Sequence, residues 1–268
     1  MRRHTQHNRK AFTLVELLLV IAIILILVAL LMPALERVQR RVDTVVCMSN
    51  LRQLMIAMNM YQGENRGEWP SSLTYTGCGY GLVDSPGATT PDVYWDDPDR
   101  VRRGVLFPYV NSLKVYVCPT FRKTYQMNAS FATRTPACTY TMNTWLDSCP
   151  SAGWANGRAC LHRSQLWDYS MARLAVLGDE GVLWLTDPKT GAALNSQLQN
   201  NLSLGVGGYG PDGICDVVAS FHNSADPYKG VGNVAFGDGH IEQVEPYRSK
   251  DVFTPKCYKQ PPYTYPCQ

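Results

Sequence analysis

The chain opens with a long apolar run that passes into an amphipathic helical pattern. The apolar stretch 12–35 is long enough to span a bilayer, because it would form a helix of about 36 Å. Over residues 36–62 apolar side chains recur every three or four positions, which predicts one apolar face on a continuing helix. This face comprises Leu35, Val38, Val42, Val45, Met48, Leu51, Leu54, Met58 and Tyr61.

After residue 62 the pattern changes to short β-prone runs. Gly63, Gly67 and Pro70 are signals that end the helix. Runs separated by Gly, Pro, Asn and Asp predict a mainly antiparallel sheet with long loops. They are KVYVC (114–118), CTYTMN (138–143), RLAVL (173–177), VLWLT (182–186), DVVASF (216–221) and the hairpin NVAFGDGHIEQV (233–244). Because the apolar face of the helix must be covered, we expect an α+β fold in which the helix packs on the sheet.

The pattern divides the chain into four parts. We expect a basic leader at 1–11, a transmembrane helix at 12–35, an amphipathic helical stalk at 36–62 and an extracytoplasmic globular head at 63–268. The positive-inside rule keeps the N-terminus in the cytoplasm. The basic residues that predict this orientation precede the apolar run, in a leader without acidic residues: Arg2, Arg3, Arg9 and Lys10.

Pro33 lies near the outer end of the predicted span. The loss of a backbone hydrogen bond at proline predicts a kink in the helix there. A membrane proline without a role is the equally weighted alternative.

Charge and cysteine content narrow the function classes. A net charge of +3, without a basic block beyond the leader, argues against nucleic-acid binding. The nine cysteines include no Cys-x-x-Cys pair, so disulfides formed outside the cytosol are favoured over a zinc ribbon or a thioredoxin-like site. Eight of the cysteines follow residue 70, which leaves the pairing open and makes Cys47 the candidate odd thiol.

Glu16 interrupts the apolar run close to its start. A carboxylate at mid-depth in a bilayer costs roughly 2.5–3.5 kcal/mol unless a partner compensates it. Cleavage between Ala11 and Phe12 would create an α-amino group, and on a neighbouring chain offset by about one helical turn that group would meet Glu16. The alternative is that Glu16 reaches the headgroups on its own. An ordinary cleaved signal peptide fits less well, because the apolar run is too long and no Ala-x-Ala site follows it.

The stretch KAFTLVELLLVIAIILILVALLMPALERVQRR resembles the N-terminus of type IV prepilins and type II secretion pseudopilins. The resemblance implies a pilin-like fold, cleavage between Ala11 and Phe12 by a prepilin peptidase, N-methylation of Phe12 and a docking role for Glu16. Ala11 departs from the family's usual Gly before the cut but keeps its small size.

A second resemblance concerns the C-terminal part. The segments CMSNLRQLMIAMNMYQGENRGEWPSSL and VAFGDGHIEQV are similar to large prepilin-type proteins, abundant in Planctomycetes, that carry a C-terminal His-x(9)-Asp-Gly motif. In this chain His222 and Asn223 precede Asp238, Gly239 and His240. Fifteen residues instead of nine separate His222 from Asp238, because SADPYKG is inserted.

No motif in the sequence supports catalysis, and we expect no enzyme. GVGGYG (205–210) is not followed by a helix that could bind a pyrophosphate. His240-x-Glu242 lacks the Pro-Cys-x-x-Cys of zinc deaminases. His162 and His222 are more typical of loop or core residues than of catalytic bases.

The expected cofactor content is none, with calcium as the weaker alternative. A hairpin turn explains Asp238 and Gly239 without a ligand. The related secretion pseudopilins hold calcium in a C-terminal loop, but no EF-hand spacing supports such a site here. The candidate oxygen ligands are Asp212, Asp216, Asp226 and Asp238.

Together the patterns predict a pilin-like structural subunit, processed by prepilin peptidase and assembled into a type II secretion pseudopilus or a type IV pilus-like filament. Its partners would be other pilin subunits, the assembly machinery and the bacterial inner membrane, with the head in the periplasm or on an extracellular filament. The alternative is a singly anchored extracytoplasmic binding module that does not polymerise.

Overall fold

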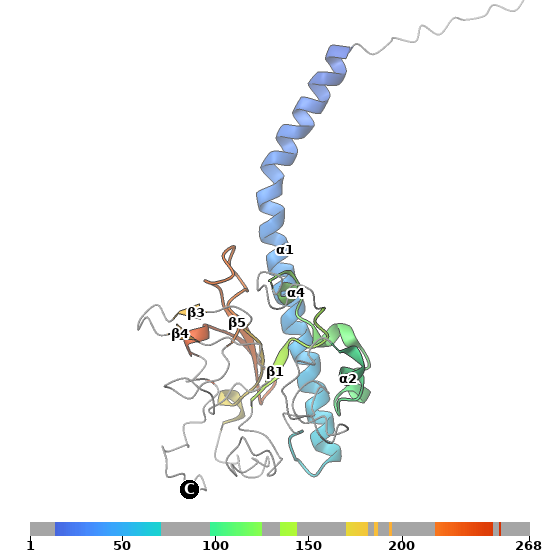
Figure 1. Cartoon of the computed structure of the whole chain (residues 1–268), viewed down its shortest axis with the longest axis vertical. Coiled ribbons are helices and arrows are strands. Elements are labelled where there is room, and N and C mark those ends of the chain that lie inside the picture. Colours follow the sequence, from blue (N-terminus) through green and yellow to red (C-terminus); the bar gives the residue numbers. More distant parts are fainter. Residues whose placement is uncertain are drawn as a thin grey trace, which may run out of the picture. The chain divides into compact units, whose positions relative to one another are not determined.

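The computed structural model describes residues 14–70, 97–124, 135–143, 170–181, 185–186, 193–194, 218–248 and 252. The chain separates into two compact units, one up to Arg41 and one from Val42 onward. The first unit consists, in its described part, of the beginning of helix α1 (Leu14–Glu64), and the second combines the rest of α1 with the head (Figure 1).

Helix α1 is continuous from Leu14 to Glu64 and includes Pro33. It ends where Arg66 and Gly67 take positive φ values of 56° and 82°, and the backbone N–H of Gly67 donates to the carbonyl of Gln62 at 2.8 Å. This left-handed ending is a common helix stop, and it confirms the end predicted from the glycines. Within the described residues α1 is the helix long and apolar enough to cross a membrane.

The first unit buries no side chain of its apolar run. All side chains from Leu14 to Leu35 are exposed. An apolar surface of this extent requires lipid or protein to cover it.

The head contains a four-stranded sheet in the order β1 (Tyr140–Met142), β2 (Ala175–Asp179), β5 (Gly232–Phe236) and β6 (Ile241–Val244). Each neighbouring pair in it is antiparallel. Strands β3 (Leu185–Thr186) and β4 (Ala193–Leu194) form a separate antiparallel pair. The α+β class and the mainly antiparallel sheet are therefore confirmed.

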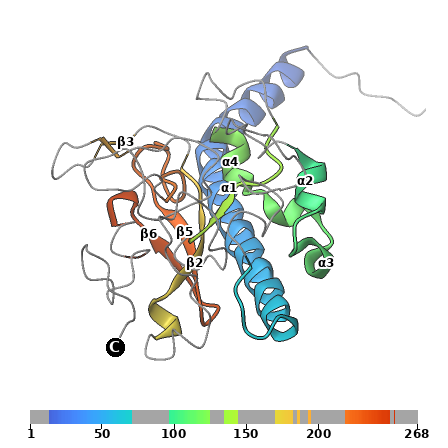
Figure 2. The same cartoon turned by 60° about the horizontal axis from the view of Figure 1, so that its bottom comes forward.

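The second half of α1, residues 42–64, lies between the sheet and the short helices α2 and α3, while α4 overlaps α1 in both views (Figures 1 and 2). The remaining helical elements are α2 (Pro98–Arg102), α3 (Phe107–Val110), η1 (Leu113–Tyr116), α4 (Pro119–Thr124), η5 (Met171–Arg173) and η6 (Pro246–Arg248).

The predicted strand positions are partly confirmed. The run at 138–143 contains β1, the run at 173–177 overlaps the first half of β2, and the hairpin at 233–244 covers the β5–β6 pair except Gly232. The strand predicted at 114–118 is wrong, because this segment makes local 3-10 bonds such as Val117 N–H to the Lys114 carbonyl. Of the run 216–221, the described residues make an isolated bridge between Val218 and Glu180 instead of a strand. Of VLWLT, the two described residues form β3.

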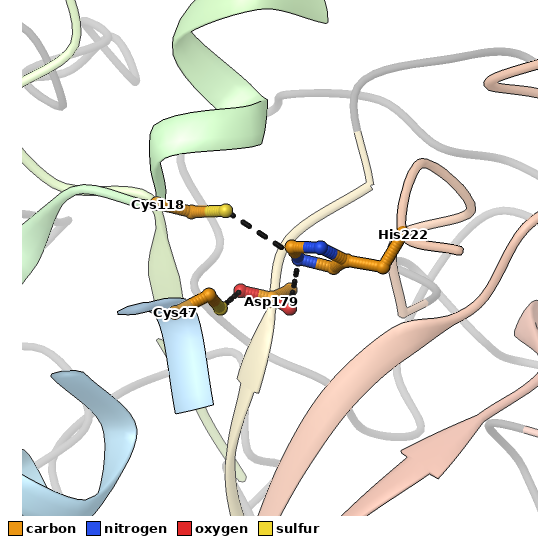
Figure 3. A group of neighbouring side chains, drawn as sticks. All are labelled: Cys47, Cys118, Asp179 and His222. Atoms are coloured by element: carbon orange, nitrogen blue, oxygen red, sulfur yellow. Dashed lines mark hydrogen bonds and ion pairs between the residues drawn. The ribbon is translucent and has the colours of Figure 1, made fainter. Parts of the chain in front are cut away.

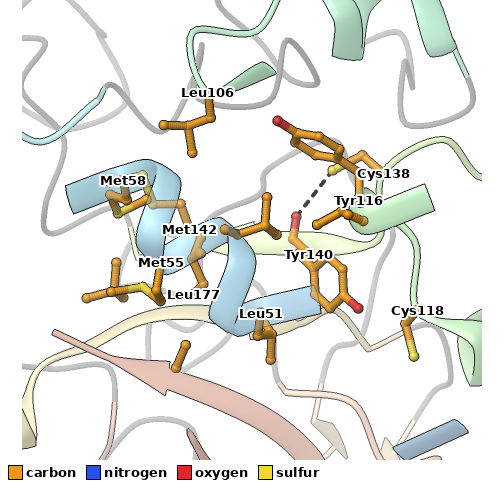
Figure 4. Close-up of a cluster of buried hydrophobic side chains, with 14 of the residues drawn as sticks. Leu51, Met55, Met58, Leu106, Tyr116, Cys118, Cys138, Tyr140, Met142 and Leu177 are labelled. Carbon is orange, nitrogen blue, oxygen red and sulfur yellow. Dashed lines mark hydrogen bonds between the residues drawn. The ribbon is translucent and has the colours of Figure 1, made fainter. Parts of the chain in front are cut away.

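The core forms where α1 meets the sheet. Leu51, Met55 and Met58 of α1 pack with Met142 and Leu177 of the sheet (Figure 4). Burial of such side chains is the main favourable term in folding. The predicted packing of the helical arm on the sheet is thus confirmed.

The buried face of α1 differs at its start from the one predicted. Val42 and Val45 are exposed, whereas Asp43, Thr44 and Cys47 are buried. The apolar pattern missed this because these three side chains make hydrogen bonds inside the head, which compensate their burial.

The contrast between the two faces of α1 is testable at neighbouring positions. Leu54 is fully buried and Ile56 is 55% exposed. Leu54→Ala should lower the free energy of unfolding by about 2–5 kcal/mol through lost burial and a cavity. The control Ile56→Ala should change it by less than about 0.5 kcal/mol. Denaturation of the detergent-solubilised full chain, followed by tryptophan fluorescence, measures both, and equal effects would contradict the assigned faces.

Candidate functional site

The structure places some of the residues predicted for processing and assembly. Ala11 and Phe12 lie outside the described residues. Glu16 is in the first turn of α1 and exposed, and Pro33 lies inside this helix. The roles of all four residues stay predictions.

The candidate calcium ligands are only partly described. Asp212 and Asp216 lie outside the described residues. Asp226 pairs with Lys229 at 3.1 Å, and Asp238 pairs with His240 Nδ1 at 2.6 Å. Asp238 also accepts the backbone N–H of His240 in the β5–β6 turn, where Gly239 has a φ of 90°. This geometry is that of a turn aspartate, as the hairpin interpretation predicts.

A different group of side chains comes together inside the head. Cys47 of α1, Cys118 at the start of α4, Asp179 at the end of β2 and His222 after the Val218 bridge place their ligand atoms within 4.8 Å of one another (Figure 3). All four residues are buried. Within the described part of the chain, this is the group of His, Cys, Asp and Glu residues close enough to share a metal ion.

The carboxylate of Asp179 lies at the centre of this four-residue cluster. Its Oδ1 accepts from the thiol of Cys47 at 2.9 Å, and its Oδ2 is 3.0 Å from His222 Nε2. The backbone N–H of Asn233 donates to Oδ2 at 2.8 Å. Cys118 Sγ lies 3.4 Å from the same nitrogen of His222.

A second set of polar groups surrounds the cluster. The hydroxyls of Thr44 and Thr120 lie 3.2 and 3.4 Å from His222 Nδ1. The side-chain amide of Asn233 donates to Cys47 Sγ at 3.1 Å. The side chains of Cys47, Asp179 and His222 therefore each have a polar contact from outside the group, and the backbone N–H of Cys118 donates to Thr139 Oγ1 at 2.7 Å.

Two glycines allow the backbone to bring His222 into the cluster. A Cβ at Gly230 would lie 2.2 Å from the carbonyl oxygen of His222, and one at Gly232 would lie 2.0 Å from Val218 Cγ1. The backbone groups of His222 and Val231 bond each other at 3.0 and 3.1 Å. Because only glycine permits so close an approach, Gly230 and Gly232 let the segment that carries His222 pack deep enough for its side chain to reach the cluster.

Neighbouring groups in the cluster shift the pKa values of His222, Cys47 and Cys118. Burial lowers the pKa of His222, but the neighbouring carboxylate of Asp179 outweighs it and raises the pKa to about 10. Burial, followed by the nearby Cys118 and Asp179, raises the pKa of the Cys47 thiol. Burial would also raise the pKa of Cys118, but its contacts with Cys47 and His222 lower it. Cys118 is therefore the more acidic of the two thiols.

The cluster does not have the arrangement of a nucleophilic triad. In such a triad the acid binds one imidazole nitrogen and the nucleophile binds the other. Here Asp179 and Cys118 both approach Nε2 of His222. Its two thiols, imidazole and carboxylate instead suit metal binding or, for the thiols alone, a disulfide.

Sequence reasoning did not find the cluster. Cys47, the candidate odd thiol, forms no disulfide with another described cysteine, and the structure places the thiol of Cys118 beside it. The four residues come from distant segments, so no spacing motif marks them. One usable signal exists, because Cys47 falls on the same helical face as Leu51, Leu54 and Met58.

Comparison with known proteins identifies the N-terminal segment. Residues 6–32 match the family model of the prokaryotic N-terminal methylation motif. No curated protein and no solved structure matches the chain. The chain therefore has a type IV pilin-like N-terminus, while the resemblance of its C-terminal part to the His-x(9)-Asp-Gly proteins stays a prediction.

The two hydroxyls beside His222 Nδ1 give a test of the surrounding polar groups. Either hydroxyl can satisfy this nitrogen alone, so Thr44→Val or Thr120→Val should each cost less than about 1 kcal/mol of unfolding free energy. The loss of unfolding free energy in the double variant should exceed the sum of the two single losses by roughly 1 kcal/mol, because the double variant leaves the buried Nδ1 without either hydroxyl. A double-mutant cycle measured by denaturation checks this, and strictly additive effects would show that the hydroxyls act independently.

Proposed function

We propose that this chain is a pilin-like structural subunit that prepilin peptidase cleaves between Ala11 and Phe12 and methylates at Phe12. It then assembles from the bacterial inner membrane into a type II secretion pseudopilus or a type IV pilus-like filament. The observation that carries the proposal is the match of residues 6–32 to the N-terminal methylation motif. This motif points to a structural subunit rather than to an enzyme.

The exposed surface of α1 supports an anchored state and an assembled state. Before assembly, lipid would cover the apolar side chains from Leu14 to Leu35, and in a filament the same helices of neighbouring subunits would cover them. Glu16 would pair with the α-amino group of Phe12 on a neighbouring subunit, which compensates a carboxylate in an apolar environment.

The helical arm carries a second exposed apolar surface, beyond the predicted span. We call Val42, Val45, Val46, Ile56 and Met60 the arm stripe; they are 41–64% exposed. Val42 and Met60 lie about five helical turns apart on one side of α1, opposite the buried face. A membrane anchor alone has no need of this surface, whereas packing between subunits would bury it. The arm stripe therefore favours a filament subunit over a binding module that does not polymerise.

Processing is tested at the N-terminus of the mature protein. Mass spectrometry of the chain isolated from its own membranes should find a first residue of N-methylated Phe12. Ala11→Arg should block the cut, because a large charged side chain replaces a small one, while Ala11→Gly should leave it intact. A mature chain that keeps residues 1–11 would overturn the proposed processing route.

Assembly is tested by variants that leave the head unchanged. Glu16→Ala should reduce recovery in the sheared filament fraction at least roughly tenfold, which corresponds to about 1.4 kcal/mol per contact. The pair Val45→Ser and Ile56→Ser should reduce it as well, and Arg52→Ser, an exposed polar position on the same helix, should not. Immunoblots of the filament and membrane fractions compare them. Normal membrane levels with no filament fraction for the wild-type chain would support the anchored module instead.

A further inference from the structure

We propose that Cys47, Cys118, Asp179 and His222 form a structural zinc site that joins helix α1 to the sheet of the head. The proposal concerns the interior of the head and does not depend on filament assembly. It rests on the donor types, their spacing, the groups that orient them and their burial.

The donor set is that of a structural zinc site. Structural zinc is bound by four protein ligands drawn from thiolates, imidazoles and carboxylates. The cluster offers two sulfurs, one imidazole nitrogen and one carboxylate. Calcium and magnesium require about six oxygen ligands, so this set does not suit them.

The spacing of the donor atoms fits a small tetrahedral ion. Bonds of 2.0–2.3 Å in a tetrahedron place neighbouring ligand atoms about 3.3–3.8 Å apart. Three neighbouring pairs here lie 2.9 Å (Cys47 Sγ to Asp179 Oδ1), 3.0 Å (Asp179 Oδ2 to His222 Nε2) and 3.4 Å (this nitrogen to Cys118 Sγ) apart, and all four ligand atoms lie within 4.8 Å of one another. Side-chain shifts of less than about 1 Å would place an ion among these atoms.

The surrounding contacts orient the donors toward a common centre. His222 directs Nε2 into the cluster, while Nδ1 lies beside the hydroxyls of Thr44 and Thr120. With Nδ1–H donating to either hydroxyl, Nε2 keeps its lone pair for the ion. Asn233 donates its side-chain amide to Cys47 Sγ and its backbone N–H to Asp179 Oδ2, as expected around anionic ligands.

Burial supplies the energetic reason for an ion. On binding, zinc replaces the thiol protons of Cys47 and Cys118 and any proton on His222 Nε2, and these protons pass to solvent. Its two positive charges then offset two of the three negative charges of the thiolates and Asp179. Two thiolates and a carboxylate in so buried a position need nearby positive charge, and the ion would supply it.

A disulfide between Cys47 and Cys118 is the competing use of the two thiols. It would involve only two of the four donors. It would give no reason for His222 Nε2 to lie 3.4 Å from Cys118 Sγ or for the carboxylate of Asp179 to lie 2.9 Å from Cys47 Sγ. The convergence of all four donors favours zinc.

Four protein ligands leave no position for a substrate, so the site stabilises the fold. It would link four segments of the head: α1, the start of α4, the end of β2 and the loop that carries His222. Loss of the ion should therefore loosen the attachment of α1 to the sheet.

The first test is metal content. The full-length chain, extracted from membranes in mild detergent without air or added chelator, should contain about one zinc per chain by elemental mass spectrometry. Cys118→Ser and His222→Gln should each lower the zinc content at least tenfold. Cys138→Ser is the matched control, because Cys138 is a buried cysteine of the same head outside the cluster, and it should retain the zinc.

A second test uses the wild-type chain, so it does not depend on whether the variants fold. The Tm of the chelated protein should be lower by roughly 5 °C or more than the Tm measured with free zinc at about 100 times Kd. Addition of zinc to the chelated protein should restore the higher Tm. Cobalt substitution should give the absorption spectrum of a tetrahedral thiolate site. A Cys47–Cys118 disulfide in the membrane-extracted protein, or reduced thiols that take up neither zinc nor cobalt, would overturn the proposal. Zinc content unchanged in a folded Cys118→Ser variant would overturn it as well.

Discussion

The buried carboxylate of Asp179 is the contact on which the organisation of the head depends. It receives the thiol of Cys47 from helix α1, the imidazole of His222 from a loop, and the backbone N–H of Asn233 from strand β5. A charged group in a dry interior is tolerated only when such partners surround it. The positions of the helix, the loop and the strand relative to β2 are therefore set by one side chain as well as by apolar packing.

The two parts of helix α1 lie in different environments. The side chains from Leu17 to Leu35 in its first unit are apolar or proline and all are exposed, which suits lipid or protein as their cover. In the head, the same helix turns one face toward the core and keeps the arm stripe exposed on the other. The polar residues Asp43, Thr44 and Cys47 mark the point where the head begins to determine which side chains are buried.

Local signals in the sequence account for most of the fold but for little of the cluster. The apolar run, the glycines after residue 62 and the β5–β6 hairpin each act over a few residues, so pattern reading finds them. The segment 114–118 reads as a strand because Val115, Tyr116 and Val117 are β-prone, yet its backbone bonds are local and its side chains enter the core from a 3-10 turn. Tertiary packing overrides propensity there.

The buried cluster could not be read from the sequence for a related reason. Its members combine through close backbone approaches such as that at Gly230, which no single-segment pattern encodes. Hydrophobicity alone predicts the wrong buried face at the start of the helical arm, because it ranks Val42 and Val45 above Asp43 and Thr44. Asp43 and Thr44 are buried because they contact Lys123 and His222, which lie far along the chain.

The long sequence separation of the contacts around the cluster has a consequence for biosynthesis. The contact between Thr44 and His222 spans 178 positions, and that between Cys47 and Asn233 spans 186. Such long-range closures are slow and come late. The helical arm leaves the ribosome first, but its inner face has no complete partner until the β5 segment has been made. Until then the apolar side chains of that face lack their cover, and exposed apolar surface of this kind makes a nascent chain prone to aggregation.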